Sequence, residues 1–296
     1  MIIDIHAHPF FLEMLADMPA PAESEDKNQV LDLISDPNAI GMAIGLMSKS
    51  YFDRGPSILA LEDFRHQMEI AGIDVVAFQV ALIKGDPAKQ INEQVAGLIS
   101  KFSGSFIAFA GFDPNTGEQA VADIEYAVKE LGFKGIKTVS ALMGLDINDK
   151  AYYPSYAKAQ ELGVPIMIHT GTALIMGSRV KHVHPLMVDD VAFDFPNLKI
   201  ICAHLGAWNY MDVHSMVVRH PNVYADLSCW PLNPHYIKLV PWGLLEETVP
   251  DKIFLGSDYP GGQTPQEALE AVKTLPISEE FRRKIMGDNA AGLLNI

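Results

Sequence analysis

Eight short apolar segments recur along the chain and alternate with longer segments in which apolar and polar positions follow helical spacing. Several of the short segments are almost wholly apolar, as is typical of strands that are covered on both faces. The pattern predicts strands over Ile2–His8, Val75–Ile83, Phe106–Phe112, Gly135–Val139, Pro165–Gly171, Lys199–His204, Val223–Cys229 and Ile253–Asp258.

The segments between these strands have the spacing of amphipathic helices. The predicted apolar face of residues 118–131 consists of Val121, Ile124, Val128 and Leu131. Gly132 then stands where a helix would end, and Gly163 follows the predicted helix Tyr153–Leu162 in the same way. Strands that alternate with helices predict a parallel sheet, and eight such units predict an α/β fold, the closed (β/α)8 or TIM barrel.

The stretch between the first strand and a helix predicted near Leu59–Ala71 interrupts this pattern. Residues 9–58 include Pro19, Pro21, an acidic patch and two apolar segments. Loops longer than ~12–15 residues are uncommon in compact domains unless they are functional or disordered. We therefore expect a single domain over residues 1–296, with an insertion after the first strand that covers the barrel mouth.

Charge and composition narrow the possible partners and the location. The net charge is −15, which disfavours binding to nucleic acid or to an anionic membrane surface. No apolar stretch reaches the ~18 residues of a membrane span, and the N-terminal segment lacks the basic start of a signal peptide. Cys202 and Cys229 have no paired spacing. These features predict a cytoplasmic protein without a disulfide framework.

His6 and His8 stand at the end of the first predicted strand. Residues two apart on a strand face the same way, so both imidazoles would point together. Two such rings form half of a metal site. A pair of ordinary core or surface histidines is the alternative, and this motif alone does not decide between them.

Three further predicted strands lead to a residue that could also bind a metal: His169, His204 and Asp258. Taken singly, each histidine could be a hydrogen-bonded core residue, and the aspartate could cap a helix or a turn. In a barrel, however, all strand ends converge at the carboxyl-terminal mouth, where active sites lie. Histidines together with a carboxylate are a common ligand set for zinc and similar ions. The set as a whole predicts a metal centre.

The same residues give the chain a resemblance to the amidohydrolase superfamily. The order HxH, His, His, Asp over strands one, five, six and eight is that superfamily's signature. The chain also looks like the amidohydrolase 2 branch, which includes aminocarboxymuconate-semialdehyde decarboxylase. The similar segments are GFKGIK (132–137), IHTG (168–171), AHLG (203–206), NVYADLS (222–228), GSDYP (256–260) and the closing helix over 282–294.

The resemblance implies a role for each residue of the signature. His6, His8, His169 and Asp258 would bind one divalent metal, most often zinc and sometimes manganese. His204 would act beside the metal as a catalytic acid or base, and Asp258 would be both ligand and catalytic proton acceptor. A metal in such a site lowers the pKa of its water toward ~7. The resemblance also implies a homodimer or homotetramer.

Four residues are candidates for contact with a substrate. Lys137 ends the fourth predicted strand, where other branches of the superfamily carry a carboxylated lysine that bridges two metals; otherwise it would be a cation at the mouth. Arg54 and Arg179 could hold a substrate carboxylate, and Trp208 could form a wall against a flat substrate. The alternative for each arginine is a solvated surface charge, and the alternative for Trp208 is packing in the core behind the barrel.

Three functions are compatible with this set of residues. We expect a non-oxidative decarboxylase (carboxy-lyase) of a small unsaturated or aromatic carboxylic acid. The alternative enzyme is a hydrolase of a lactone, ester or amide, or a hydratase, because the same residues serve all of these reactions. The non-enzyme alternative is a barrel that has lost its metal and binds a partner. The complete set of signature residues argues against this last possibility.

Overall fold

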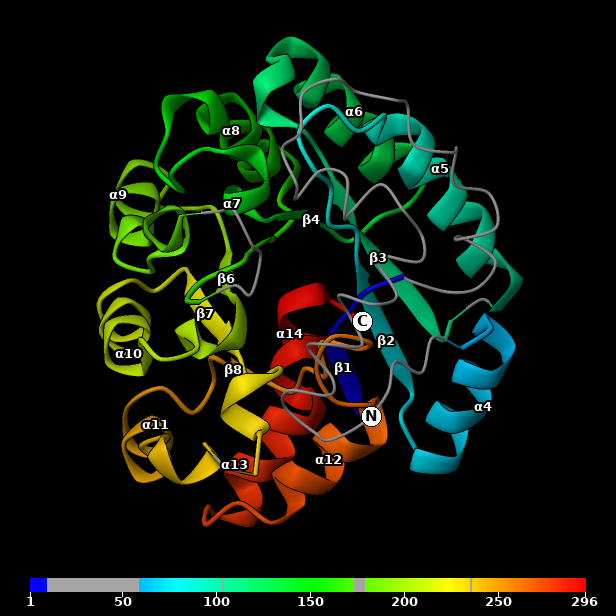
Figure 1. Cartoon of the computed structure of the whole chain (residues 1–296). Coiled ribbons are helices and arrows are strands. Elements are labelled where there is room, and N and C mark those ends of the chain that lie inside the picture. The colour runs from blue at the N-terminus through cyan, green and yellow to red at the C-terminus, as the bar shows by residue number, and fades with distance from the viewer. Residues whose placement is uncertain (10–58, 103, 173–178, 235) are drawn as a thin grey trace.

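The computed structural model describes residues 1–9, 59–102, 104–172, 179–234 and 236–296. Within these ranges, eight parallel strands form one sheet in sequential order, and Figure 1 shows this sheet inside the molecule with helices outside it. The strands are β1 (Ile3–Ala7), β2 (Val75–Gln79), β3 (Phe106–Gly111), β4 (Gly135–Thr138), β5 (Ile166–Ile168), β6 (Ile200–Cys202), β7 (Val223–Asp226) and β8 (Ile253–Phe254). Each predicted strand is present, and the predicted (β/α)8 barrel is confirmed.

Backbone hydrogen bonds between β1 and the segment after β8 bring the two edges of the sheet together. The amide of Ile5 donates to the carbonyl of Leu255 at 3.0 Å, and the amide of Ser257 donates to the carbonyl of His6 at 3.1 Å. The amide of His8 donates to the carbonyl of Tyr259 at 2.7 Å. These bonds satisfy edge groups that an open sheet would leave unpaired.

Helices surround the strands, and the last helix, α14 (Asn289–Leu294), lies near the centre of the view (Figure 1). Within the described ranges they are α4 (Leu61–Ala71), α5 (Ala88–Ile99), α6 (Glu118–Lys129), α7 (Ser140–Met143), α8 (Tyr153–Leu162), α9 (Met187–Asp194), α10 (Tyr210–Arg219), α11 (Trp242–Thr248), α12 (Pro265–Lys273), α13 (Glu279–Arg283) and α14 (Asn289–Leu294). None of them is long and apolar enough to cross a bilayer. The predicted insertion falls on residues 10–58, outside the described residues, so its position over the mouth stays a prediction.

Two helices illustrate how the sequence pattern translates into packing. Helix α8 ends at Leu162 as predicted, and Gly163 follows with φ 70°, a left-handed conformation that favours glycine. Helix α6 buries Ala120, Ile124 and Ala127, so its packed face is rotated from the predicted one. Alanines are small enough to let the helix approach its neighbours closely, and the face that packs is not the one with the largest side chains.

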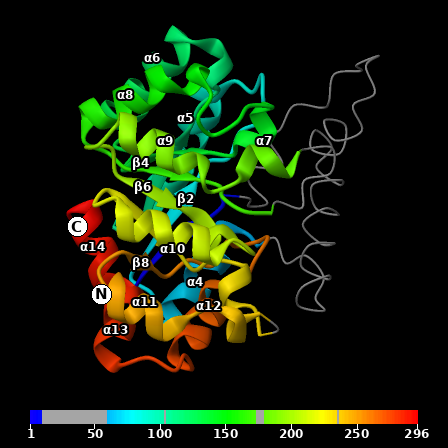
Figure 2. The same ribbon diagram turned by 90° about the vertical axis from the view of Figure 1, so that its left-hand side faces the viewer.

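The barrel interior divides into an apolar end and a polar end. Side chains of the strands and of the last helix pack into one apolar cluster at the end where the strands begin. This cluster includes Ile3, Ile5, Val75, Ala77, Phe109, Met167, Ile201 and Phe254 from the barrel, and Ala290, Leu293 and Leu294 from α14. Both termini lie at this end of the molecule (Figure 2). The opposite end, where the strands finish, carries the polar residues described next.

Candidate metal centre at the barrel mouth

Six of the side chains singled out in the sequence come together at the carboxyl ends of the strands. They are His6 in β1, His8 directly after it, Lys137 in β4, His169 after β5, His204 in the 3-10 helix η5 (Ala203–Gly206) and Asp258 after β8. The ring centroid of His6 lies 5.3 Å from that of His8 and 5.0 Å from that of His204. The rings of His169 and His204 are 4.7 Å apart. The expected convergence is therefore present.

Hydrogen bonds at the far side of the rings turn two imidazole lone pairs toward one carboxylate oxygen. His6 Nδ1 lies 2.9 Å from Asp226 Oδ2, and His8 Nδ1 lies 2.8 Å from the carbonyl oxygen of Gln79. Both partners only accept, so in the neutral rings Nδ1 carries the hydrogen and Nε2 the lone pair. The two Nε2 atoms lie 3.4 Å and 3.2 Å from Asp258 Oδ1. The two Nε2 atoms and the carboxylate oxygen are acceptors that face one another, and such a group can bind a cation between its atoms.

Two further observations indicate that the residues fit a divalent metal. His169 Nε2 is buried and has no hydrogen-bond partner among the described residues. His6, His204 and Asp258 each offer one ligand atom, and these atoms lie within 4.8 Å of one another. Nitrogen and carboxylate oxygen donors suit zinc and manganese. This group contains His204, whereas the resemblance implied His8 and His169, so the exact ligand set stays a prediction.

Electrostatics in the site favour the protonation states that metal binding requires. Burial, with the nearby Lys137 charge, lowers the pKa of His6 to about 3. Burial also lowers the pKa of Lys137 to about 8, against the opposing effect of Asp258 and Asp226. Burial raises the pKa of Asp258, but His204, His8 and His6 outweigh it and hold that pKa well below the usual value. Neutral imidazoles and an ionised carboxylate are the forms that bind metal.

The backbone after β6 and β8 is turned into the left-handed region, which is uncommon for residues other than glycine. His204 has φ 59° and Asp258 has φ 60°. Both residues were predicted to lie within strands, but the ladders of β6 and β8 end before them, at Cys202 and Phe254. These turns, and not simple strand alternation, direct the two side chains toward the site. Strained backbone of this kind is typical of functional sites.

Close approach of the loop after β6 explains the glycine of the IHTG segment. A Cβ at Gly171 would lie 2.1 Å from the carbonyl oxygen of Gly206, so only glycine fits there. Thr170 also donates from Oγ1 to the carbonyl of Ala203 at 2.7 Å. The loops that carry His169 and His204 are therefore joined directly.

A family model described as Amidohydrolase (Amidohydro_2) matches residues 3–296. The chain belongs to the amidohydrolase family. It is 23% identical over 245 residues to 2-amino-3-carboxymuconate-6-semialdehyde decarboxylase of Dictyostelium discoideum, which covers 71% of this chain and 67% of that protein. It is 22% identical over 321 residues to gamma-resorcylate decarboxylase of Rhodococcus jostii (strain RHA1), with 88% and 95% covered.

A solved structure of 5-carboxyvanillate decarboxylase from Novosphingobium aromaticivorans, complexed with manganese and 4-hydroxy-3-methoxy-5-nitrobenzoic acid, has the same fold as this amidohydrolase. The TM-score is 0.71 and the identity 20%, with 100% of this chain and 96% of that chain covered. The family resemblance found in the sequence is confirmed by these comparisons.

Sequence reasoning gave no role to Asp226 and Ser228 of this amidohydrolase. Both are fully buried in the site at the end of β7. Asp226 contacts His6 Nδ1, and the Ser228 hydroxyl contacts His204 Nδ1 at 2.8 Å. The available signal was a polar pair, two residues apart, at the end of an apolar strand that carried no predicted ligand. That pattern is the same one that singled out His6 and His8.

The predicted substrate contacts differ in where they lie. Lys137 is 1% exposed, and its Nζ lies 3.2 Å from His6 Nε2, inside the site. Trp208 follows η5 and is 43% exposed; its ring packs against Trp230 and Tyr236, with centroids 4.9 Å and 4.4 Å away. The exposed Arg179 precedes the 3-10 helix η4 (Val180–Val183), without a contact to the site in the described part of the chain. Arg54 lies outside the described residues.

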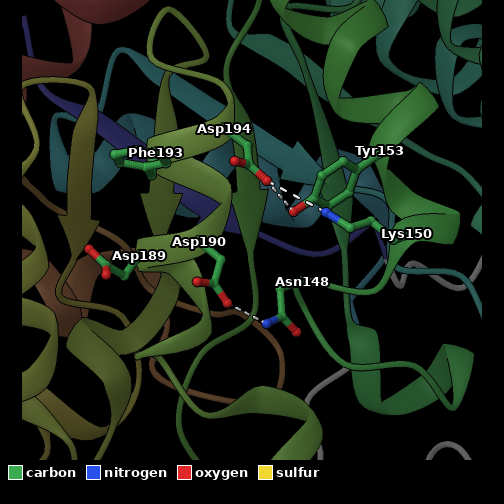
Figure 3. A pocket seen from close by; sticks show the side chains of 7 residues that line it. All are labelled: Asn148, Lys150, Tyr153, Asp189, Asp190, Phe193 and Asp194. Carbon is green, nitrogen blue, oxygen red and sulfur yellow. Dashed lines mark hydrogen bonds and ion pairs between the residues drawn. The ribbon is translucent and has the colours of Figure 1, made fainter.

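A separate hollow of about 310 Å³ lies on the outside of the barrel, beside α8 and α9 (Figure 3). Its acidic side chains already have partners. Asp190 accepts from Asn148 at 2.6 Å, and Asp194 accepts from the Tyr153 hydroxyl at 2.6 Å. Asp189 lies 2.6 Å from His220 Nε2. This hollow contains none of the residues that form the mouth cluster, and its paired acids serve to hold neighbouring elements together.

Proposed function

We propose that this amidohydrolase is a metal-dependent decarboxylase of a small unsaturated or aromatic carboxylic acid. The observation that carries the proposal is the convergence of the acceptor atoms of His6, His8 and Asp258, with the ring of His169 against that of His204 in the same site. The relatives named above, which are decarboxylases, support this reaction over the others that the same residues could serve.

In this proposal His6, His8, His169 and Asp258 hold one divalent ion, zinc in the first place and manganese as the alternative. The ion, when bound, supplies positive charge that binds an anionic substrate group and stabilises negative charge as it develops. The four residues project from β1 and from the loops after β1, β5 and β8, so a rigid scaffold holds them.

Protein groups then carry the proton that the reaction needs. The bond between the carboxylate carbon and its neighbour breaks, carbon dioxide leaves, and the electron pair stays on the neighbouring carbon. A proton must reach that carbon to complete the product. His204, whose ring lies against those of both His6 and His169, or Asp258 would deliver it.

Substrate recognition is assigned to the rest of the mouth. Lys137 would attract the carboxylate, and Trp208, supported by Trp230 and Tyr236, would lie against a flat ring. Arg179 and Arg54 would supply further cations. We also propose a homodimer or homotetramer in the cytoplasm, with no nucleic-acid partner, on the acidic charge, the family and the two free thiols.

One observation favours the hydrolase alternative. Lys137 is buried at the end of β4, directly beside His6. If it were carboxylated it could bridge two metals, with His204 as a ligand of the second. A two-metal centre would suit hydrolysis of a lactone, ester or amide.

The test measures metal content by plasma mass spectrometry and carbon dioxide release from a panel of aromatic and unsaturated acids, with lactones in parallel. We expect about one equivalent of zinc or manganese and turnover of at least one acid. His169→Ala should lose both the metal and turnover. Two equivalents with lactone cleavage would favour the hydrolase, and full activity of the variant would contradict the site assignment.

A further inference from the structure

The hydroxyl of Ser228 lies at the junction of three polar groups in the site. Ser228 is fully buried. Its Oγ contacts Asp226 Oδ1 closely, lies 2.8 Å from His204 Nδ1 and lies 3.0 Å from His6 Nδ1. A serine hydroxyl has one hydrogen to donate and two lone pairs to accept with. Only one of the three contacts can therefore use the hydrogen of Ser228.

Asp226 is the group that takes this hydrogen. As a carboxylate it can only accept, and its Oδ1 already accepts from the backbone amides of His204 at 3.1 Å and Ser228 at 2.8 Å. Since Asp226 cannot donate, the short contact requires the Ser228 hydroxyl to donate to it. Ser228 Oγ is then left as an acceptor toward both histidines, and His204 must carry its hydrogen on Nδ1.

The direction of the hydrogen bond at Ser228 also determines the direction of the hydrogen bond between His204 and His169. In a neutral His204 with hydrogen on Nδ1, the Nε2 atom is an acceptor. His204 Nε2 lies 3.1 Å from His169 Nδ1, so His169 must donate from Nδ1. The Nε2 atom of His169 is then left with its lone pair, and this is the buried atom without a partner among the described residues.

We infer that Ser228 is a positioning residue whose hydroxyl orients the hydrogen bonds from His169 through His204 to Asp226, and thereby fixes which ring nitrogen of His169 keeps the lone pair that a metal could bind. The metal consequence rests on the proposed function, but the order of hydrogens along the chain does not. His6 reaches Asp226 Oδ2 directly, so it keeps its own orientation without Ser228.

The test compares the unaltered protein with Ser228→Ala, using long-range proton–nitrogen correlation spectra of 15N-histidine-labelled, chelator-treated samples. Variants that replace single histidines assign the signals. We expect His204 and His169 to be protonated at Nδ1 alone in the unaltered protein. In Ser228→Ala their two ring nitrogens should move toward averaged shifts as both hydrogen positions become populated, while His6 keeps its shifts.

A competition assay with a chromophoric zinc chelator gives the second readout. Loss of a partner behind a metal ligand typically weakens metal binding by about 10–100-fold, and we expect this range for Ser228→Ala. The matched control is Ser140→Ala, which removes another buried hydroxyl, one that donates to the carbonyl of His182. The control should bind zinc within about twofold of the unaltered protein and keep its histidine shifts.

His204 protonated at Nε2 in the unaltered protein would overturn the inference, whether or not any variant folds. So would Ser228→Ala with unchanged His204 and His169 shifts. Predicted shifts in a protein that binds neither zinc nor manganese would leave the order of hydrogens standing but remove the proposed function and the metal consequence. If the protein turned over substrate while His204 and His169 carried their hydrogens on Nε2, the proposed function would stand and the inference about Ser228 would fail.

Discussion

The two ends of the barrel interior are built from the same strands but have opposite chemistry. Where the strands begin, Ile3, Val75 and Phe254 pack against Leu293 and other apolar residues of α14. Where they finish, the interior is filled by histidines, aspartates and a lysine whose polar atoms are almost all hydrogen-bonded or paired. One end can be stable because it excludes water, and the other can carry out chemistry because it concentrates charge.

This contrast indicates that stability and activity can be altered separately in this amidohydrolase. Changes at the apolar end should lower the free energy of unfolding and leave metal content unchanged. Changes at the polar end should abolish metal binding with much less effect on folding. The four predictions that follow test this separation, beginning with the largest expected effect.

The largest effect is expected for Asp258→Asn at the mouth. The neutral amide removes the only carboxylate that faces His6 Nε2 and His8 Nε2 in the described part of the site. We expect metal content below a tenth of an equivalent and a loss of kcat/KM of at least ~10³-fold, equivalent to about 4 kcal/mol. Asp190→Asn, in the outer hollow, is the control and should keep the metal content and the kcat/KM of the unaltered protein. An active, metal-loaded Asp258→Asn protein would contradict the assignment.

The second effect is expected at the apolar end, from Leu293→Ala in α14. Leu293 is buried against the barrel, so its removal leaves a cavity, and we expect a loss of about 3 kcal/mol in the free energy of unfolding, measured in urea. Metal stoichiometry should stay unchanged. Leu239→Ala, at a leucine that is 62% exposed, should cost less than about 0.5 kcal/mol. Equal losses in both variants would mean that α14 does not close the barrel.

The third effect is expected for Asp226→Asn, which should alter His6 but not His204 or His169. Two backbone amides donate to Oδ1, so the amide oxygen should stay there and the amide nitrogen should face His6 Nδ1. His6 would then carry its hydrogen on Nε2 and lose its ligand lone pair. We expect zinc affinity about 10–100-fold weaker, with His204 and His169 spectra unchanged. A change in those two histidines instead would show that the two branches are not independent.

The smallest effect is expected for Trp208→Ala, at the rim of the mouth. The indole packs on Trp230 and Tyr236 and is not one of the proposed metal ligands, so metal content should not change. If the ring forms a wall for a flat substrate, loss of stacking worth about 1 kcal/mol should raise KM several-fold with little change in kcat. Phe193→Ala, at an exposed aromatic residue in the outer hollow, is the matched control. Unchanged KM in Trp208→Ala would leave Trp208 as a packing residue.

Much of this architecture was predictable from local pattern. Short apolar runs of strand length, each followed by a helical segment, specify a parallel barrel because few other folds bury so many strands on both faces. The barrel in turn brings the strand ends together, so residues as far apart as His6 and Asp258 could be placed in one site. The packed face of α6 was not predictable, because burial there follows small alanines and not the larger valines.

Spacing and residue type in the sequence were enough to predict the fold class, the family and six of the side chains at the mouth, but not Asp226 and Ser228. The tertiary structure alone decided how those residues are oriented. The left-handed turns at His204 and Asp258, the Ser228 hydroxyl between Asp226 and His204, and the contact between His204 and His169 all depend on how distant segments meet. Hydrogen bonds have a direction, and that direction is set by the partner across the barrel, which no local pattern contains.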